Sequence, residues 1–97
     1  MSAIFHPAAD EEFQRAIEAY QAESPQLGLR FYRSVLVTVA RIEAHPYVRP
    51  RLRGPVRKCL VEDFPYRLLY TVEPDRLFVV AIMHGKRKPD YWFERTK

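Results

Sequence analysis

The dipeptide His45-Pro46 divides the chain into two halves with different hydrophobic periods. The residue before a proline is pushed out of helical geometry, so a helix that reaches His45 must end there. Before this point, apolar residues recur every three or four positions, which is the period of a helix that buries one face. After it, apolar and aromatic residues come in short runs typical of β-strands. The sequence therefore predicts a helical first half and a β second half, which is the α+β class.

Two helices are predicted in the first half of the chain. Residues 3–5 are apolar and are expected to form a short strand. Pro7 then begins a helix over about residues 7–22, because a missing N–H costs nothing in the first helical turn. Ser24 and Pro25 begin a second helix that runs to about Ala44. The link between them is so short that they should form an antiparallel hairpin. The predicted buried positions are Ala9, Phe13, Ala16, Ile17 and Tyr20 in the first helix and Phe31, Val35, Val39 and Ile42 in the second.

Three strands are predicted in the second half, over residues 56–62, 66–72 and 77–83. All three segments are rich in β-branched and aromatic residues, and the gaps between them are short enough to be hairpin turns. Residues 77–83 are apolar throughout and are expected to form the buried central strand. Residues 48–55 are rich in proline and arginine and are expected to form a loop. Residues 88–97 are expected to form a short tail.

The predicted order is strand, helix, helix and then three strands. This order gives a small antiparallel sheet with the helical hairpin on one face and the other face free. Lys58, Arg67 and the residues after Met83 are expected to line the free face or its rim. Tyr66 and Tyr70 alternate on one face of their strand and are expected to be buried in the core.

Length and composition exclude several classes of protein. A chain of 97 residues has room for one core, so a single domain over residues 1–97 is expected. No apolar run approaches the roughly 20 residues that span a bilayer, and the N-terminus lacks a signal-peptide pattern, so we expect a cytoplasmic protein without a membrane partner. Cys59 is the only cysteine and is expected to be a small buried side chain in a strand. No cysteine cluster offers a zinc site, and we expect no metal and no cofactor.

The positive charge is concentrated in the second half of the chain. Residues 1–48 have four basic and six acidic side chains, whereas residues 49–97 have twelve basic and six acidic ones. These values, net −2 and net +6, give the formal charge of +4. Because charge steers an oppositely charged partner, the basic half is expected to face nucleic acid, a DNA-bound enzyme or an acidic protein.

Four short segments form a pattern along the chain. They are Phe5-His6-Pro7-Ala8-Ala9, Leu27-Gly28 leading into Phe31, Leu52-Arg53-Gly54 followed by Phe64-Pro65-Tyr66-Arg67-Leu68-Leu69-Tyr70, and His84-Gly85-Lys86-Arg87-Lys88-Pro89-Asp90-Tyr91-Trp92. In this order, spacing and chain length they resemble the RelE/ParE family of small basic toxins over about residues 3–95. The resemblance implies the same α+β fold that the periodicity predicts.

The resemblance also implies a biological role and partners. Members of this family are toxins of type II toxin–antitoxin systems, and a co-expressed antitoxin holds them inactive. A segment of the antitoxin wraps the toxin, and the complex often represses its own promoter, so operator DNA is reached only through the antitoxin. A basic toxin suits an acidic, partly disordered antitoxin that folds as it binds. The exposed side of the helical hairpin and the sheet edge are the expected docking surfaces.

RelE-like members cut messenger RNA on the ribosome, which requires deprotonation of the 2′-hydroxyl, stabilisation of the phosphate charge and protonation of the leaving oxygen. By resemblance to that branch, Lys58 falls on one of two strand lysines, and Arg67 and Arg87 fall on two arginines. His84 is the candidate base, because its reference pKa of about 6.5 suits proton transfer near neutral pH. The candidate catalytic set is therefore Lys58, Arg67, His84 and Arg87.

ParE-like members instead poison DNA gyrase and need no catalytic set. Leu60 stands where RelE-like members have their second lysine, and Phe93 falls at the late tyrosine unless Tyr91 replaces it. These departures, and the Pro-x-Tyr-Trp ending, favour the ParE-like subgroup. Charge clustering at residues 86–88 then suggests that the target is bound by Arg87, Lys88, Tyr91 and Trp92.

Each candidate residue also has a structural interpretation. Lys58 and Arg67 suit a phosphate-steering or structural role equally well, and His84 suits a hydrogen-bonded position at a strand end. The aromatic segment at residues 91–93 is typical of a tail that seals a core. A third interpretation of the whole chain is a degenerate family member that only binds its antitoxin and regulates transcription.

Overall fold

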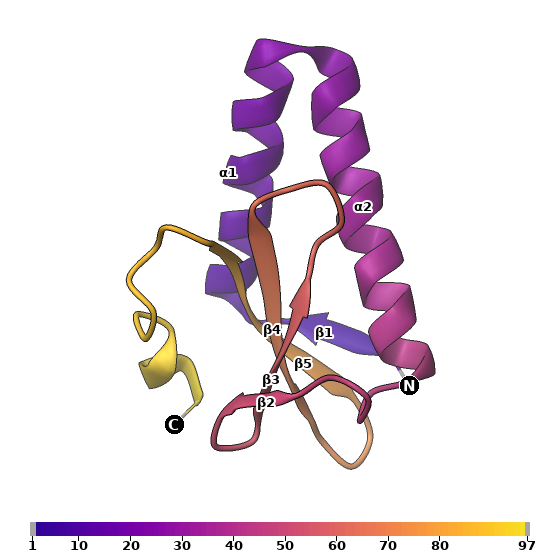
Figure 1. The fold of residues 1–97 in the computed structure, drawn as a ribbon, viewed down its shortest axis with the longest axis vertical. Helices are drawn as coiled ribbons and strands as arrows, with labels where there is room; N and C mark the ends of the chain where they lie inside the picture. The colour runs from indigo at the N-terminus through magenta and orange to yellow at the C-terminus, as the bar shows by residue number, and fades with distance from the viewer. Residues whose placement is uncertain (1, 97) are drawn as a thin grey trace.

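The computed structural model describes residues 2–96 and contains two helices, five strands and a terminal 3₁₀ turn (Figure 1). The elements are β1 (Ala3–Phe5), α1 (Pro7–Glu23), α2 (Pro25–Ala44), β2 (Arg51–Arg53), β3 (Val56–Leu60), β4 (Tyr66–Val72), β5 (Leu77–His84) and η1 (Phe93–Thr96). The two helices form the predicted antiparallel hairpin, which stands upright in Figure 1 and extends beyond the sheet. Both helices begin and end within a residue of the predicted bounds.

Ser24 joins the two helices, because it is the C-cap of α1 and the N-cap of α2. Its N–H donates to the carbonyl of Tyr20 at 3.0 Å and closes α1, while its Oγ accepts from the N–H of Leu27 at 3.4 Å and opens α2. Gly28 in α2 then faces Gln21 of α1, where an added Cβ would lie 2.9 Å from the Gln21 Cβ. The hairpin is therefore tight because the turn is one capped residue and the facing position has no side chain.

The sheet has the order β1-β5-β4-β3-β2, and it is mixed. Strands β2 to β5 pair antiparallel, but β1 pairs parallel with β5, with Ala3 opposite Leu77. The three strands predicted after the helices are antiparallel, as expected, and the parallel pairing of β1 with β5 corrects the expectation that the sheet as a whole is antiparallel. A parallel pair requires a long crossover connection, and the helical hairpin that follows β1 begins that crossover.

The segment predicted to be a loop contains an extra edge strand. Arg51 lies opposite Arg57 and Arg53 opposite Val56, so β2 and β3 form a hairpin around Gly54, whose φ is +55°. Pattern reasoning missed β2 because it has three exposed residues and lies between Pro50 and Pro55. Prolines are confined to strand edges, which is where β2 lies.

The core has two parts, one on each face of the sheet. Between the sheet and the helices, the ring of Phe31 lies with its centroid 5.0–6.1 Å from those of Phe13, Tyr20, Phe64 and Tyr66. Tyr70 is buried in the same part, as predicted.

The second face of the sheet is also covered, so the prediction of a free face is wrong. A second cluster there contains Val56, Leu69, Val80, Ala81, Met83 and Trp92. Trp92 comes from the C-terminal segment, which crosses this face. A bulge in β5 contributes to the cluster, because Leu69 pairs with Ala81 and Tyr70 with Val79, which leaves Val80 as an extra residue. The apolar run of β5 is therefore buried on both sides.

Among residues 2–96, no helix combines the length and the apolarity that crossing a bilayer requires.

We predict that Phe31→Ala lowers the free energy of unfolding by about 3–5 kcal/mol, because it leaves a cavity at the centre of the aromatic cluster. Leu60→Ala is the control, since Leu60 is 63% exposed and its loss is expected to cost less than about 0.5 kcal/mol. Urea denaturation followed by circular dichroism measures both values. Equal losses for the two variants would contradict this account of the core.

Candidate functional site

The C-terminal segment, residues 85–96, separates two clefts. It leaves the end of β5 and returns beside the sheet to η1, drawn in yellow in Figure 1. Trp92 fixes its middle, because the indole is 1% exposed and its Nε1 donates to the carbonyl of Pro89 at 2.8 Å. The tail is therefore packed onto the domain, as the structural interpretation of the aromatic segment expected.

The first cleft, of ≈ 400 Å³, lies on the second face of the sheet and is basic. Lys58 on β3 and Arg67 on β4 line it, and neither has an acidic partner within residues 2–96. A Cβ at Gly85 would overlap the Arg67 guanidinium, so this glycine leaves room for the arginine. Arg53 adds a third cation, which stacks 3.7 Å from the Phe93 centroid and lies 3.8 Å from an oxygen of Asp90. The cleft suits an anion.

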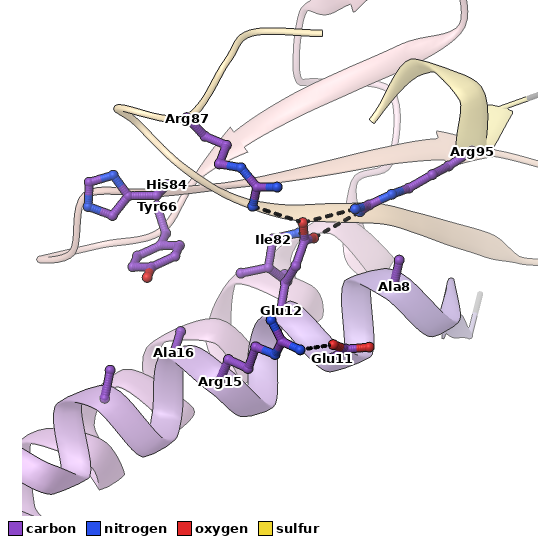
Figure 2. A pocket seen from close by; sticks show the side chains of 11 residues that line it. Ala8, Glu11, Glu12, Arg15, Ala16, Tyr66, Ile82, His84, Arg87 and Arg95 are labelled. Atoms are coloured by element: carbon purple, nitrogen blue, oxygen red, sulfur yellow. Dashed lines mark hydrogen bonds and ion pairs between the residues drawn. The ribbon is translucent and has the colours of Figure 1, made fainter. Parts of the chain in front are cut away.

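The second cleft, of ≈ 360 Å³, lies between α1 and the ends of β4 and β5 (Figure 2). His84 lies here, with its ring centroid 5.0 Å from that of Tyr66, and its Nδ1 accepts from the N–H of Lys86 at 3.0 Å. Arg87 reaches across this cleft, as Figure 2 shows, and its Nη1 lies 3.8 Å from Glu12 Oε2.

The four candidate catalytic residues therefore do not converge on one point. Successive strand residues point to opposite faces, so Tyr66 faces the helices and Arg67 faces the other side. Lys58 and Arg67 share the first cleft, whereas His84 and Arg87 share the second.

The residue that organises the second cleft is Glu12 of α1, which sequence reasoning did not single out. Its side chain is 14% exposed. It accepts hydrogen bonds from the N–H of Ile82 at 3.1 Å, from the hydroxyl of Tyr91 at 2.6 Å and from Arg95 at 2.9 and 3.1 Å. One local signal was present, because Glu12 lies three residues after Ala9 and so borders the buried stripe of α1.

Tyr91 contacts the carboxylate of Glu12 and two arginines. Burial raises the pKa of Tyr91 above its ordinary value, and the hydrogen bond to Glu12 raises it further. The guanidinium carbon of Arg87 lies 3.9 Å from the ring centroid, and that of Arg95 lies 5.0 Å away. The Tyr91 hydroxyl is thus a protonated donor directed toward α1, away from Lys58 and Arg67.

No group of three or more histidine, cysteine or acidic side chains that suits a metal ion occurs within residues 2–96. Cys59 is buried in β3, and its Sγ lies 3.1 Å from Arg49 Nε.

A family model described as "ParE toxin of type II toxin-antitoxin system, parDE" matches residues 3–89. The chain belongs to the ParE toxin family. It is therefore a type II toxin, and the resemblance that the four segments indicated is confirmed. The match ends before Tyr91, so the end of the C-terminal segment lies outside the part of the chain that the family model covers.

A solved structure supports the same fold. The chain resembles the structure "Chromosomal ParDE TA system from P. aeruginosa", with a TM-score of 0.76, 17% sequence identity, and coverage of 87% of this chain and 95% of that chain. At this identity the likeness bears on the fold alone. No curated protein matches the sequence.

We predict that stability falls as the pH rises above about 10, the ordinary pKa of tyrosine. The pKa values of Tyr20, Tyr66, Tyr70 and Tyr91 are all raised in the folded state, chiefly by burial. The folded state therefore holds these protons more tightly than the unfolded state, and the stability is fully present below pH 10 and lost above it.

Denaturation midpoints between pH 8 and pH 11 test this prediction. Tyr91→Phe should reduce the loss, because burial and the hydrogen bond to Glu12 raise the pKa of Tyr91, so that the folded protein keeps this proton at a pH at which the unfolded chain releases it. An identical decline in both proteins would mean that Tyr91 does not carry the effect.

Proposed function

We propose that this toxin inhibits DNA gyrase by binding the enzyme and trapping its cleaved DNA intermediate, without catalytic chemistry of its own. The observation that carries the proposal is the separation of the candidate catalytic residues. RNA cleavage needs a base, a charge stabiliser and an acid around one phosphate, each within hydrogen-bond reach of its atom. Lys58 and Arg67 line one cleft and His84 lines the other, so the three side chains do not share a common cleft.

Membership of the ParE toxin family supports the same proposal. So does the charge of the C-terminal segment, which begins with Lys86, Arg87 and Lys88. Lys86 and Lys88 make no ion pair with any of residues 2–96. A gyrase–DNA complex carries phosphate charge that free cations of this kind can contact. Of the candidate contacts, the exposed cations are the direct ones, while Tyr91 and Trp92 hold the segment in place.

We also propose that an antitoxin neutralises the toxin by covering the outer face of α2. Leu29, Tyr32 and Leu36 are 41–45% exposed and recur every three or four residues, so they form one apolar stripe. Exposed stripes of this kind receive amphipathic partner segments. The similar P. aeruginosa structure is described as a toxin–antitoxin system, which supports a partner of this class. Operator DNA would be contacted only through the antitoxin.

The first test is a gyrase supercoiling assay with purified protein, scored for inhibition and for trapped linear DNA. We expect both with the unaltered toxin. The variant Lys86→Gln/Arg87→Gln/Lys88→Gln should need roughly tenfold more protein or above, because it removes the exposed ionic contacts of Lys86 and Lys88, about 0.5–1 kcal/mol each, together with the positive charge of Arg87 beside them. The matched control Arg15→Gln/Arg41→Gln/Arg76→Gln loses the same three charges elsewhere and should act like the unaltered protein.

The alternative function, a ribosome-dependent endoribonuclease, has one observation in its favour, the pairing of Lys58 and Arg67 in a basic cleft. It predicts that gyrase is untouched at high toxin excess, that messenger RNA is cut during translation, and that Arg67→Ala abolishes the cut sites. That combination of results would replace the gyrase proposal. Unimpaired growth of a bacterium that expresses the toxin without antitoxin would instead indicate a degenerate member that only regulates transcription.

For the antitoxin surface, we predict that Leu36→Glu weakens the complex with the co-expressed antitoxin at least tenfold, because it puts a charge into an apolar contact. Growth inhibition by the free toxin should remain. Leu60→Glu makes the same substitution at an exposed leucine on β3 and serves as the control. Titration of the purified chains against each other measures both affinities, and equal affinities would remove α2 from the interface.

A further inference from the structure

The strongest unexplained feature of the structure is the number of donors that converge on Glu12. Its partners come from β5 and from the C-terminal segment, 70 to 83 positions later in the chain. Figure 2 shows the carboxylate between the guanidinium groups of Arg87 and Arg95.

The geometry uses both oxygens of the carboxylate. Oε1 accepts from the N–H of Ile82 and from Arg95 Nη1, while Oε2 accepts from the Tyr91 hydroxyl and from Arg95 Nη2. Arg87 Nη1 is a more distant partner of Oε2. A carboxylate has about four acceptor sites, so its capacity is filled. The two-pronged bond to Arg95 is the strongest geometry that an arginine and a carboxylate form.

This network fixes the segment that contains Lys86, Arg87 and Lys88. Lys86 and Lys88 are the immediate neighbours of Arg87, and Arg87 contacts both Glu12 and the ring of Tyr91. Arg87 is therefore engaged inside the molecule, whereas the two lysines beside it have no acidic partner in the described part of the chain. The three adjacent cations thus have different surroundings, which their sequence does not reveal.

We infer that Glu12 is a positioning residue of the toxin. It holds residues 85–96 against α1 and so presents Lys86 and Lys88 to the target, and Arg87 acts as an internal anchor of the segment. The choice of these lysines as contacts rests on the proposed function, because that function requires target-facing cations. The anchoring itself rests only on the hydrogen bonds and ion pairs of Glu12.

The simplest competing explanation is that Trp92 packing alone holds the segment. Glu12→Gln separates the two explanations, because it keeps the shape of the side chain and removes its charge. Glu11→Gln is the matched control, since Glu11 is the preceding residue of α1, is 60% exposed and, within residues 2–96, forms an ion pair only with Arg15. Both variants lose one negative charge from the same helical turn.

The readout is the emission of Trp92, the only tryptophan of the chain. If Glu12 anchors the segment, Glu12→Gln shifts the emission to longer wavelength and raises acrylamide quenching at least twofold, and the amide of Ile82 exchanges faster with deuterium. Glu11→Gln should match the unaltered protein in all three measurements. Circular dichroism in the same buffer establishes that both variants are folded.

Toxicity is measured by growth inhibition in a bacterium without antitoxin, at equal levels of folded protein. Glu12→Gln should inhibit growth at least tenfold less, and Glu11→Gln should act as the unaltered toxin. Lys86→Gln/Lys88→Gln should lose toxicity while the emission of Trp92 stays unchanged. Arg87→Gln should change the emission, which is the result that distinguishes an anchor from a contact.

Two outcomes overturn the inference. An unchanged emission and an unchanged Ile82 exchange in Glu12→Gln would mean that Glu12 does not hold the segment. Full toxicity of a variant whose C-terminal segment is no longer held would mean that toxicity does not depend on the position of this segment.

If Glu12→Gln fails to fold, Tyr91→Phe is the second variant. It removes a single hydrogen bond, keeps the ring between the arginines and should give smaller changes of the same kind. Failure of the unaltered toxin to trap gyrase DNA would contradict the gyrase target alone, because the emission and exchange measurements do not involve gyrase.

Discussion

Strand β5 is apolar on both faces, and the rest of the fold is arranged to keep water from both. The helical hairpin covers one face with Phe31 at the centre of its contacts, and Trp92 covers the other. The bulge at Val80 adds a further apolar residue to the second face, so that face cannot remain exposed without a large hydrophobic cost. The C-terminal segment is consequently a structural layer, and its position follows from the apolar character of β5.

The same two-sided burial determines what chemistry the surface can support. Both faces of the sheet are covered by other parts of the chain. Polar side chains at the edge of the sheet therefore lie in different clefts, depending on the face to which they point. Arg67 and Tyr66 are consecutive residues, yet one lines the basic cleft and the other faces His84 beneath the helices. Lys58 and Arg67 can stabilise the charge of a bound anion, which agrees with the proposal of a toxin that acts by binding.

Local signals in the sequence predicted most of the fold, and distant pairings account for what they missed. Proline positions and apolar spacing identified both helices and the three long strands, because each is determined by residues within a few positions of one another. The parallel pairing of β1 with β5 joins Ala3 to Leu77, and no local pattern encodes such a pair. The strand β2 is equally invisible to pattern reasoning, since its three residues are exposed and become a strand only beside β3. Candidate residues were predicted by type and position, but the face of the sheet on which each one lies depends on register and on the bulge.

Glu12 is the clearest case of information that only the tertiary structure holds. In sequence it is one of three successive acidic residues near the N-terminus of a helix, where acidic residues favour the helix dipole and need no further explanation. In the fold it is the point where α1, β5 and the C-terminal segment meet. A mobile segment must be ordered when it binds, and this ordering of the loop lowers the binding free energy that its contacts provide. A segment whose backbone is already fixed by a buried carboxylate has met most of the ordering cost during folding. Anchoring of residues 85–96 by Glu12 therefore favours tight binding, even though the small toxin offers only a few exposed charges on this segment.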